Sequence, residues 1–326
     1  YYRFDMAEEP KLVSVDPEGK TLHKQDFSPG DGKLRKQLRE GVTILERIRA
    51  AHELAKKPKR ANVAAIAEAY DEQQFWGVRQ QFASALAKAG SSEAIAALAK
   101  IVADEEDPMV IGHVLGQVLQ LRDDAIWTAT QQRLDRGDLP PWSVNAAWRV
   151  LGAKREDGDL SAFVEAARTA SIHDIARRGA IGALAATRRA EAAQPLLDLV
   201  EEPQVEYRAR AAAASALGEL GGFLEDRDKE KVREKLEDVV RTGELPVAQA
   251  AAAALSLMGA RESIGRVEQL AARVSHQEEV GVRRIAERIY AGKDDKVAAL
   301  EAQLGDLRGE YRKLVERLEK LEPNDV

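Results

Sequence analysis

The strongest constraint on the fold of this chain is a pattern that recurs about every 33 residues. One copy, VAQAAAAALSLMGA at 247–260, is centred on Leu255, and an apolar residue holds the same place in seven other copies. The gaps between these anchors are 32, 32, 32, 34, 33, 38 and 34 residues, and such near-constant spacing predicts an array of structural repeats. The anchors are Leu54, Leu86, Val118, Val150, Leu184, Leu217, Leu255 and Ile289.

Each copy contains two segments with a helical period. In one copy Val247, Ala251, Leu255 and Met258 follow at intervals of four, four and three residues, which puts them on one face of a helix. A second periodic segment follows the first in most copies, so each repeat is predicted to be a helical hairpin. These second segments are 93–102, 125–134, 160–169, 192–201, 231–240 and 263–273.

Glycine and proline punctuate the repeats. A glycine follows the first helix in most copies, and we expect it to adopt the left-handed conformation just past the helix end. Prolines near the start of several repeats suit a first helical turn, where the missing N–H has no partner to lose. The glycines are Gly90, Gly152, Gly221 and Gly259, and the prolines are Pro108, Pro141, Pro203 and Pro246. A charged insertion at 221–231 lengthens one gap and is predicted to be a solvated loop.

A hairpin of this length cannot bury its own apolar stripe, so neighbouring hairpins must stack to share a core. The sequence therefore predicts an all-α solenoid of about seven to eight helical hairpins over 28–292. The period, the helix lengths and the absence of a tetratricopeptide or ankyrin signature resemble HEAT repeats.

The two ends do not fit the repeat. Residues 11–16 and 20–27 are rich in β-formers and flank a DPEG turn at 16–19, which predicts a short N-terminal β-hairpin. Two strands alone are marginal in water, so we expect them either to complete a sheet that begins before Tyr1 or to cap the first repeat. The chain starts without an initiator Met, in keeping with a piece of a longer protein.

At the other end, 293–326 carries an apolar heptad pattern that predicts a coiled-coil-like helix. Two partners fit it. The helix pairs with a second copy to form a homodimer, or it docks on the last repeat of its own chain. The seam consists of Val297, Leu300, Leu304, Leu307, Tyr311, Leu314, Leu318 and Leu321.

The hairpin, a short loop at 28–33 and the helical stretch ERIRAAHELAKK at 46–57 follow one another in an order that resembles aminopeptidase N-like (gluzincin) zinc metallopeptidases. The match covers about 10–57 by motif and the remainder by architecture. It implies that 1–27 are the last strands of an upstream β-sandwich. It also implies that the helical domain closes over an upstream catalytic domain of the same polypeptide and limits the access of peptide substrates.

The residues that such a family needs for catalysis are missing from this chain. Its zinc site uses His-Glu-x-x-His on one helix, and the nearest approach here runs from His52 to Lys56, with Lys in place of the second His. The Gly-x-Met-Glu-Asn motif is absent too. The resemblance therefore implies a non-catalytic part with no cofactor of its own, the Zn²⁺ belonging to the parent enzyme. His113 and His173 are likewise isolated, with no chelating neighbour.

Composition narrows the alternatives. The net charge of −6 and the pI near 5.6 argue against a nucleic-acid binder, including a HEAT-like DNA-repair protein. No apolar run of about 18 residues exists to span a membrane. The absence of cysteine excludes disulfides and thiol catalysis and leaves the compartment open. The alternative to a peptidase domain is a free-standing HEAT scaffold that binds a protein or peptide along its concave face.

Two sets of residues are candidates for binding. Trp76 and Trp142 lie near predicted helix starts and are our candidates for peptide contact in a groove, whereas Trp127 and Trp148 fit a core role better. Arginines recur on the first helices, where they either form a ladder with neighbouring acids or bind a peptide carboxylate. These arginines are Arg47, Arg79, Arg149, Arg178, Arg210 and Arg284.

Overall fold

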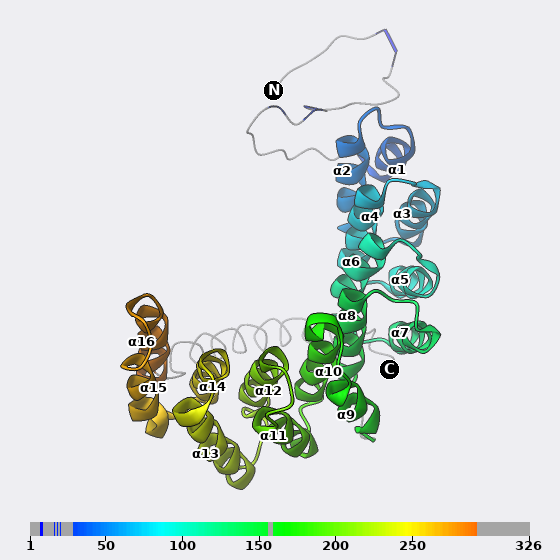
Figure 1. Ribbon diagram of the computed structural model, residues 1–326. Helices are drawn as coiled ribbons and strands as arrows, with labels where there is room; N and C mark the ends of the chain where they lie inside the picture. Colours follow the sequence, from blue (N-terminus) through cyan, green and yellow to red (C-terminus); the bar gives the residue numbers. More distant parts are fainter. Residues whose placement is uncertain are drawn as a thin grey trace, which may run out of the picture. The chain divides into compact units, whose positions relative to one another are not determined.

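The computed structural model describes residues 7, 8, 16, 18, 20, 29–155 and 159–291 (Figure 1). Within these residues the chain forms sixteen α-helices and no strand. The first eight are α1 (Asp31–Glu40), α2 (Ile44–Ala55), α3 (Arg60–Glu72), α4 (Trp76–Ala89), α5 (Ser92–Asp104), α6 (Pro108–Val118), α7 (Asp124–Arg136) and α8 (Pro141–Gly152). The others are α9 (Ser161–Arg168), α10 (Ile175–Ala186), α11 (Ala193–Glu201), α12 (Tyr207–Leu220), α13 (Asp226–Thr242), α14 (Leu245–Met258), α15 (Ile264–Ala271) and α16 (His276–Ala291).

Three short 3₁₀ turns accompany the helices: η1 (Ile172–Asp174), η2 (Ala190–Ala192) and η3 (Arg261–Ser263). Consecutive helices pair, so the described residues contain eight hairpins, in agreement with the predicted seven to eight. The fold is an all-α, HEAT-like solenoid. The predicted N-terminal hairpin lies almost wholly outside the described residues, and the predicted heptad helix at 293–326 lies entirely outside them.

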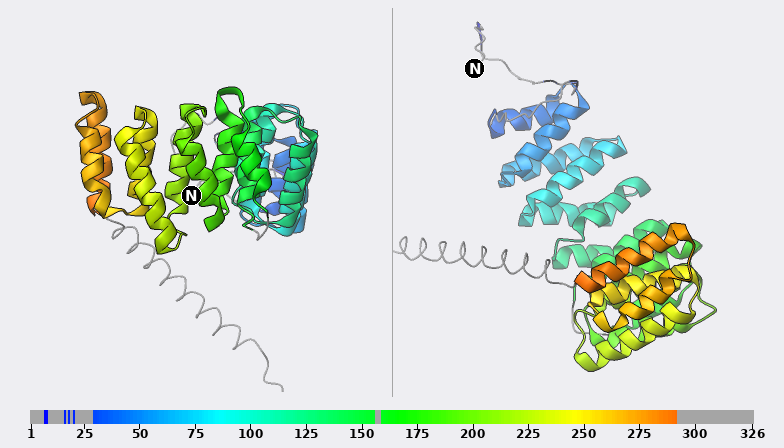
Figure 2. Two further views of the ribbon diagram at one scale, coloured as in Figure 1. Left: turned by 60° about the horizontal axis from the view of Figure 1, so that its bottom comes forward. Right: turned by 90° about the vertical axis from the view of Figure 1, so that its left-hand side faces the viewer.

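The chain divides into two compact units, Tyr1–Pro195 and Leu196–Val326. In the first unit the even-numbered helices α2, α4, α6, α8 and α10 pack on one another in sequence, and α1, α3, α5 and α7 form a second layer beside them. In the second unit α12 packs on α14, α14 on α16 and α13 on α15. Figure 2 shows the stacking within each unit from two further directions. No helix in the described ranges is both long and apolar enough to cross a membrane.

The eight anchors all lie on even-numbered helices and are at most 1 % exposed. Burial of a Leu, Ile or Val side chain to this extent contributes about 1.5–3 kcal/mol per residue, so the anchors supply a large share of the stacking energy. The period read from the sequence therefore reports the shared core of the solenoid.

The glycine predictions are only partly right. Gly90 and Gly259 end their helices with φ of 59° and 68°, the left-handed conformation that was expected. Gly152 instead lies inside α8, where a Cβ would come within 2.6 Å of the Ala183 Cα on α10. Gly221 follows α12 with a right-handed φ of −56°. Gly152 is therefore needed for close helix packing, not for a turn.

Two further boundaries differ from expectation. Pro108, Pro141 and Pro246 occupy first helical turns as predicted, but Pro203 lies in the turn between α11 and α12. The insertion predicted as a loop at 221–231 is half helical, because α13 already begins at Asp226. Ion pairs one turn apart, such as that between Arg233 and Glu230, support this exposed charged helix.

Candidate peptide-binding surface

The two tryptophans singled out in the sequence lie at the starts of even-numbered helices in the first unit. Trp76 is the first residue of α4 and Trp142 the second residue of α8. The side chains stay 39 % and 53 % exposed, although each belongs to the residue type that proteins most readily use as a buried anchor. Both are therefore available on the surface at equivalent places in the repeat.

Met109 fills the same place on α6, between the two tryptophans, and Ile44 fills it on α2. Each is 50 % exposed. The four residues are 32, 33 and 33 positions apart, so each successive hairpin presents one large apolar side chain at its helix start. We call this set, together with exposed Phe75, the apolar ledge: Ile44, Phe75, Trp76, Met109 and Trp142.

Local packing fixes the rings of the ledge. The Phe75 ring lies over Gly77, where a Cβ would come within 3.0 Å of it, and its centroid is 5.5 Å from that of Trp76. The Trp142 ring lies against Gly112 of α6, where a Cβ would be 3.3 Å from Cδ1. Glycine at these two positions lets an aromatic ring rest on a helix surface, which holds the ring in place while its outer side faces solvent.

Polar contacts order the same helix starts. The Asp107 carboxylate accepts the Met109 N–H at 2.9 Å and so caps α6. The Gln80 side-chain amide on α4 donates to the Met109 carbonyl at 2.8 Å and ties the starts of α4 and α6 together. The backbone beneath the ledge is thus held by hydrogen bonds across neighbouring repeats.

The other two tryptophans are not on the ledge. Trp148 on α8 makes an edge-on contact with Phe163 of α9, at 5.7 Å between centroids. Trp127 on α7 lies under the ammonium group of Lys154, at 5.5 Å. Both are partly buried between elements of the first unit.

Beside the ledge, Arg79 on α4 connects to acids that precede α6. Its guanidinium lies 3.0 Å from the Glu105 carboxylate and 3.2 Å from that of Asp107. In the second unit Arg210 reaches Glu244 at 3.0 Å, one repeat further along the chain. These contacts favour the ladder of arginines and acids over a carboxylate-binding role at Arg79 and Arg210.

Glu105 is a residue that sequence reasoning missed. It is 6 % exposed and accepts a short hydrogen bond from the Tyr70 hydroxyl. Burial first, and then the Glu105 carboxylate, raise the pKa of Tyr70 well above its ordinary value. A buried carboxylate held by Arg79 and Tyr70 stabilises the junction of α3, α4 and α5 rather than offering a reactive group.

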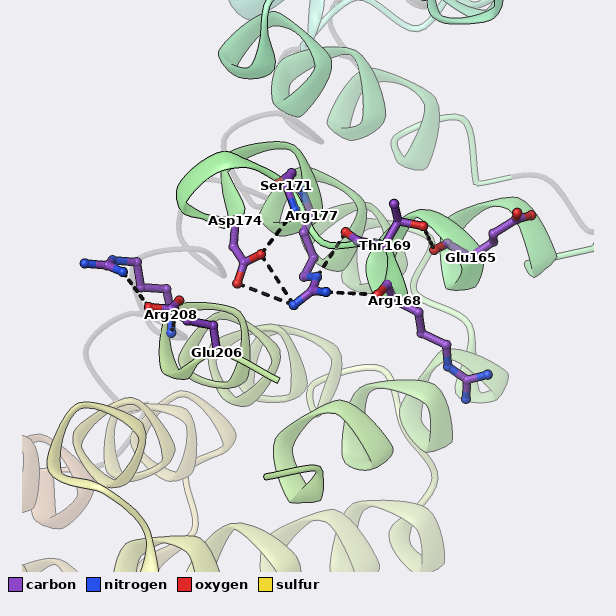
Figure 3. Close-up of polar contacts among 8 residues, drawn as sticks. All are labelled: Glu165, Arg168, Thr169, Ser171, Asp174, Arg177, Glu206 and Arg208. Atoms are coloured by element: carbon purple, nitrogen blue, oxygen red, sulfur yellow. Dashed lines mark hydrogen bonds and ion pairs between the residues drawn. The ribbon is translucent and has the colours of Figure 1, made fainter. Parts of the chain in front are cut away.

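A second arginine network lies between α9 and α10 (Figure 3). Buried Arg177 donates to the carbonyls of Thr169 and Arg168 at 3.1 and 2.9 Å, and to the Asp174 carboxylate at 3.4 Å. The first two bonds satisfy carbonyls at the end of α9, which a helix leaves without intrahelical partners. The sequence analysis chose the neighbouring Arg178 instead.

The histidines are held by single polar contacts. His52 lies 3.3 Å from the Gln81 side chain, and His113 lies 2.7 Å from the Ser84 hydroxyl. Burial lowers the pKa of His113. His173 has a left-handed φ of 50° within η1. Across the part of the chain that the structure describes, no group of three or more His, Asp or Glu side chains could hold a metal ion.

Comparison with known proteins agrees with the repeat. Residues 33–116 match the family of HEAT repeats. A search of curated proteins gives no match.

Three solved structures illustrate the fold-level similarity. Human deoxyhypusine hydroxylase is 17 % identical, with 80 % of this chain and 96 % of that chain covered, at a TM-score of 0.35. The CpcE and CpcF complex of phycocyanin lyase from Nostoc sp. PCC7120 is 19 % identical, with 85 % and 100 % covered, at a TM-score of 0.35. A designed armadillo repeat protein is 16 % identical, with 69 % and 98 % covered, at a TM-score of 0.29. At these scores the likenesses carry no argument about function.

Proposed function

We propose that this chain is a non-catalytic HEAT-repeat scaffold that binds an extended peptide segment along the apolar ledge. The observation that carries the proposal is the recurrence of one exposed, large apolar side chain at the same place in four successive hairpins. Single exposed apolar residues are ordinary on protein surfaces and need no explanation. A row of them with the period of the fold is a contiguous apolar surface, which marks a binding site.

The spacing of the ledge suggests the form of the ligand. Packed helices lie about 8–10 Å apart, so neighbouring ledge residues are separated by about that distance. An extended or polyproline-type chain advances about 3.1–3.4 Å per residue, so every third side chain meets the next hairpin. The expected ligand is therefore an extended segment with apolar residues at every third position.

We further propose that the scaffold is the C-terminal helical domain of an aminopeptidase N-like zinc metallopeptidase, in which the ledge would guide peptides or meet the upstream domains. The support is the order of turn, loop and first helix over about 10–57. Within the described residues, the Asp16 carboxylate accepts the Lys20 N–H at 3.0 Å, and Arg49 of α2 donates to the Asp16 carbonyl at 3.0 Å. These contacts support a turn at Asp16 that is tied to the first hairpin.

Peptide binding to the ledge can be tested with a labelled 12-residue peptide that carries leucine at every third position and serine elsewhere. We expect the full chain to bind this peptide more tightly than a peptide of the same composition with its leucines clustered. The triple variant W76A, M109A and W142A should lose binding without unfolding, because all three side chains are exposed. L257A, which removes an exposed leucine from α14, is the matched control. Equal binding by the triple variant would refute the ledge proposal.

The peptidase setting has a separate test. The native polypeptide is expected to carry a His-Glu-x-x-His helix before Tyr1, and the chain by itself is expected to show no turnover of aminoacyl reporter substrates and no stoichiometric zinc. A native sequence without that motif would end the peptidase proposal and leave the ledge proposal standing. Turnover by the chain alone that a chelator abolishes would contradict its non-catalytic role.

A further inference from the structure

A second unusual surface of the first unit lies at the opposite ends of the even-numbered helices. The residue four places after the anchor ends or follows each of these helices. It is glycine in three repeats, at Gly90, Gly221 and Gly259. In the three consecutive repeats that follow Gly90 it is basic: Arg122, Lys154 and Arg188. Arg155 and Arg189 add a second basic residue in two of these repeats.

Two of these arginines occupy backbone conformations that favour glycine. Arg155 has φ of 56° and Arg188 has φ of 58°, close to the 59° and 68° of Gly90 and Gly259. A side chain in this left-handed region is strained relative to glycine. Since the array uses glycine at this turn elsewhere, two strained arginines in adjacent repeats point to a use for their side chains.

The basic residues surround a pocket of about 420 Å³ between α7, the end of α8, the start of α9 and the turn after α10. Trp127 and Phe163 are its aromatic residues, Lys154, Arg155 and Arg189 contribute positive charge, and glutamine and threonine side chains complete the lining. The Lys154 ammonium lies 5.5 Å from the centre of the Trp127 ring. The pocket therefore combines apolar surface with several cations.

Like charges gather at this pocket in a protein whose net charge is −6. Partial burial and the positive charges of Arg188 and Arg122 lower the pKa of Arg155, which places the three guanidinium groups within electrostatic reach of one another. The carboxylate of Asp159 in the lining is hydrogen-bonded to the N–H and hydroxyl of Ser161, at 2.9 and 2.5 Å. Mutual repulsion of this kind is relieved when an anion binds.

Capping of helix ends is the simplest structural explanation, and it accounts for part of the cluster. Arg155 donates to the Ala186 carbonyl at the end of α10, at 3.3 Å. Arg136 and Arg273 cap other helix ends in the same way, through the carbonyls of Ala103 and Arg241, without a left-handed backbone. Capping therefore does not require the strained positions or the convergence of three repeats on one pocket.

We infer that this pocket binds an acidic peptide segment, with Asp or Glu side chains against the basic cluster and a neighbouring apolar side chain between Trp127 and Phe163. Guanidinium groups bind carboxylates with paired hydrogen bonds, and the aromatic residues add apolar contact that a free anion would not use. A nucleic acid fits less well, because the remainder of this acidic chain would repel an extended polyanion. The inference does not depend on the ledge proposal.

The test uses C-terminally amidated peptides, so that side-chain carboxylates alone are probed. We expect the full chain to bind a labelled peptide of alternating Glu and Phe, and to bind the Gln and Phe version at least about tenfold more weakly, as for the loss of a charge-assisted hydrogen bond. Binding should weaken as salt is added. Inorganic phosphate and a 12-nucleotide single-stranded DNA are the competitors, and tighter binding of either than of the acidic peptide would overturn the inference.

Glycine substitution separates a binding role from a structural one. R188G should weaken binding of the acidic peptide at least about tenfold while keeping or raising the melting temperature, because it relieves the left-handed strain. R122Q should weaken binding without touching a left-handed residue, and R241Q, in the second unit, should bind as the wild type does. A lower melting temperature with unchanged affinity in R188G would show a purely structural role and overturn the inference. It would also be overturned if the peptide bound the E156Q and D157N double variant but not the wild type, because acids of the chain itself would then neutralise the cluster.

Discussion

The hairpins of the first unit and those of the second share their buried anchors but present different residues to solvent. At the helix starts the first unit carries Ile44, Trp76, Met109 and Trp142, whereas α12 begins with Tyr207, whose ring lies 4.7 Å from the Arg208 guanidinium, and α14 with half-buried Leu245. At the helix ends the first unit changes from glycine to arginine and lysine, and the second keeps Gly221 and Gly259.

This difference shows how a repeat array separates its fold from its sites. Stacking requires the same apolar position in every hairpin, so the anchors recur along the whole chain. Positions that face solvent carry no such requirement, and a departure from the repeat at one of them has to be explained by something other than stacking. Both candidate binding surfaces were found as departures of this kind, and both lie in the first unit.

The largest expected effect tests whether the two units pack by the same rule. A Cβ at Gly179 would come within 2.4 Å of the Asn145 Cα in the first unit, and one at Gly218 within 2.6 Å of the Ala254 Cα in the second. We expect G179A and G218A each to lower the free energy of unfolding by about 1–3 kcal/mol, because backbone atoms would have to move apart. Urea denaturation followed by circular dichroism measures the effect.

Gly116 on α6 supplies the matched control, since a Cβ there meets no atom within 4 Å. G116A should raise stability by about 0.5–1 kcal/mol, the usual gain from replacing a helical glycine. If G179A were as stable as G116A, the close approach of α8 and α10 would not constrain the first unit.

A smaller effect is expected from two arginines that Figure 3 shows together. Arg177 is 7 % exposed and holds the end of α9, whereas Arg208 pairs with Glu206 at the exposed start of α12. R177A should cost about 1–3 kcal/mol, because it leaves the buried Asp174 carboxylate and two carbonyls without this donor. R208A should cost at most about 1 kcal/mol, as for exposed ion pairs.

Thermal unfolding of both variants, with R177K beside them, checks this comparison. Lysine keeps the charge but cannot reach three acceptors with one rigid fork, so R177K should recover only part of the stability. Equal losses in R177A and R208A would mean that burial does not distinguish the two contacts.

The sequence was sufficient to predict the architecture, because the anchors and the helical period follow from the chemistry of stacking. It was insufficient where a residue answers to a partner far along the chain. Gly152 was assigned to a turn because its contact with Ala183 is visible only once α8 and α10 are packed. The choice between Arg177 and Arg178 depends on the left-handed turn at His173 and Asp174, which has no sequence pattern.

The candidate surfaces were partly predictable in the same sense. Trp76 and Trp142 stood out by residue type and by their place at helix starts. Met109 did not, although its 33-residue spacing from both would have identified it. Aligning the residues four places after each anchor would also have shown the change from glycine to arginine. Its meaning required the pocket and the left-handed backbone that the structure supplies.

The smallest expected effect concerns the pH dependence of the first unit. Burial lowers the pKa of His113, so the unfolded state binds more protons than the folded state as the pH falls past the ordinary histidine value of about 6.5. Stability should therefore be highest above that value and decline as the pH falls from 7.5 to 5.5. H113Q, which keeps a hydrogen-bonding group near Ser84, should show a shallower decline in urea midpoints over this range. H276Q, at an exposed position of α16, controls for the loss of a histidine. A decline in H113Q as steep as in the wild type would mean that other groups set the acid sensitivity of this unit.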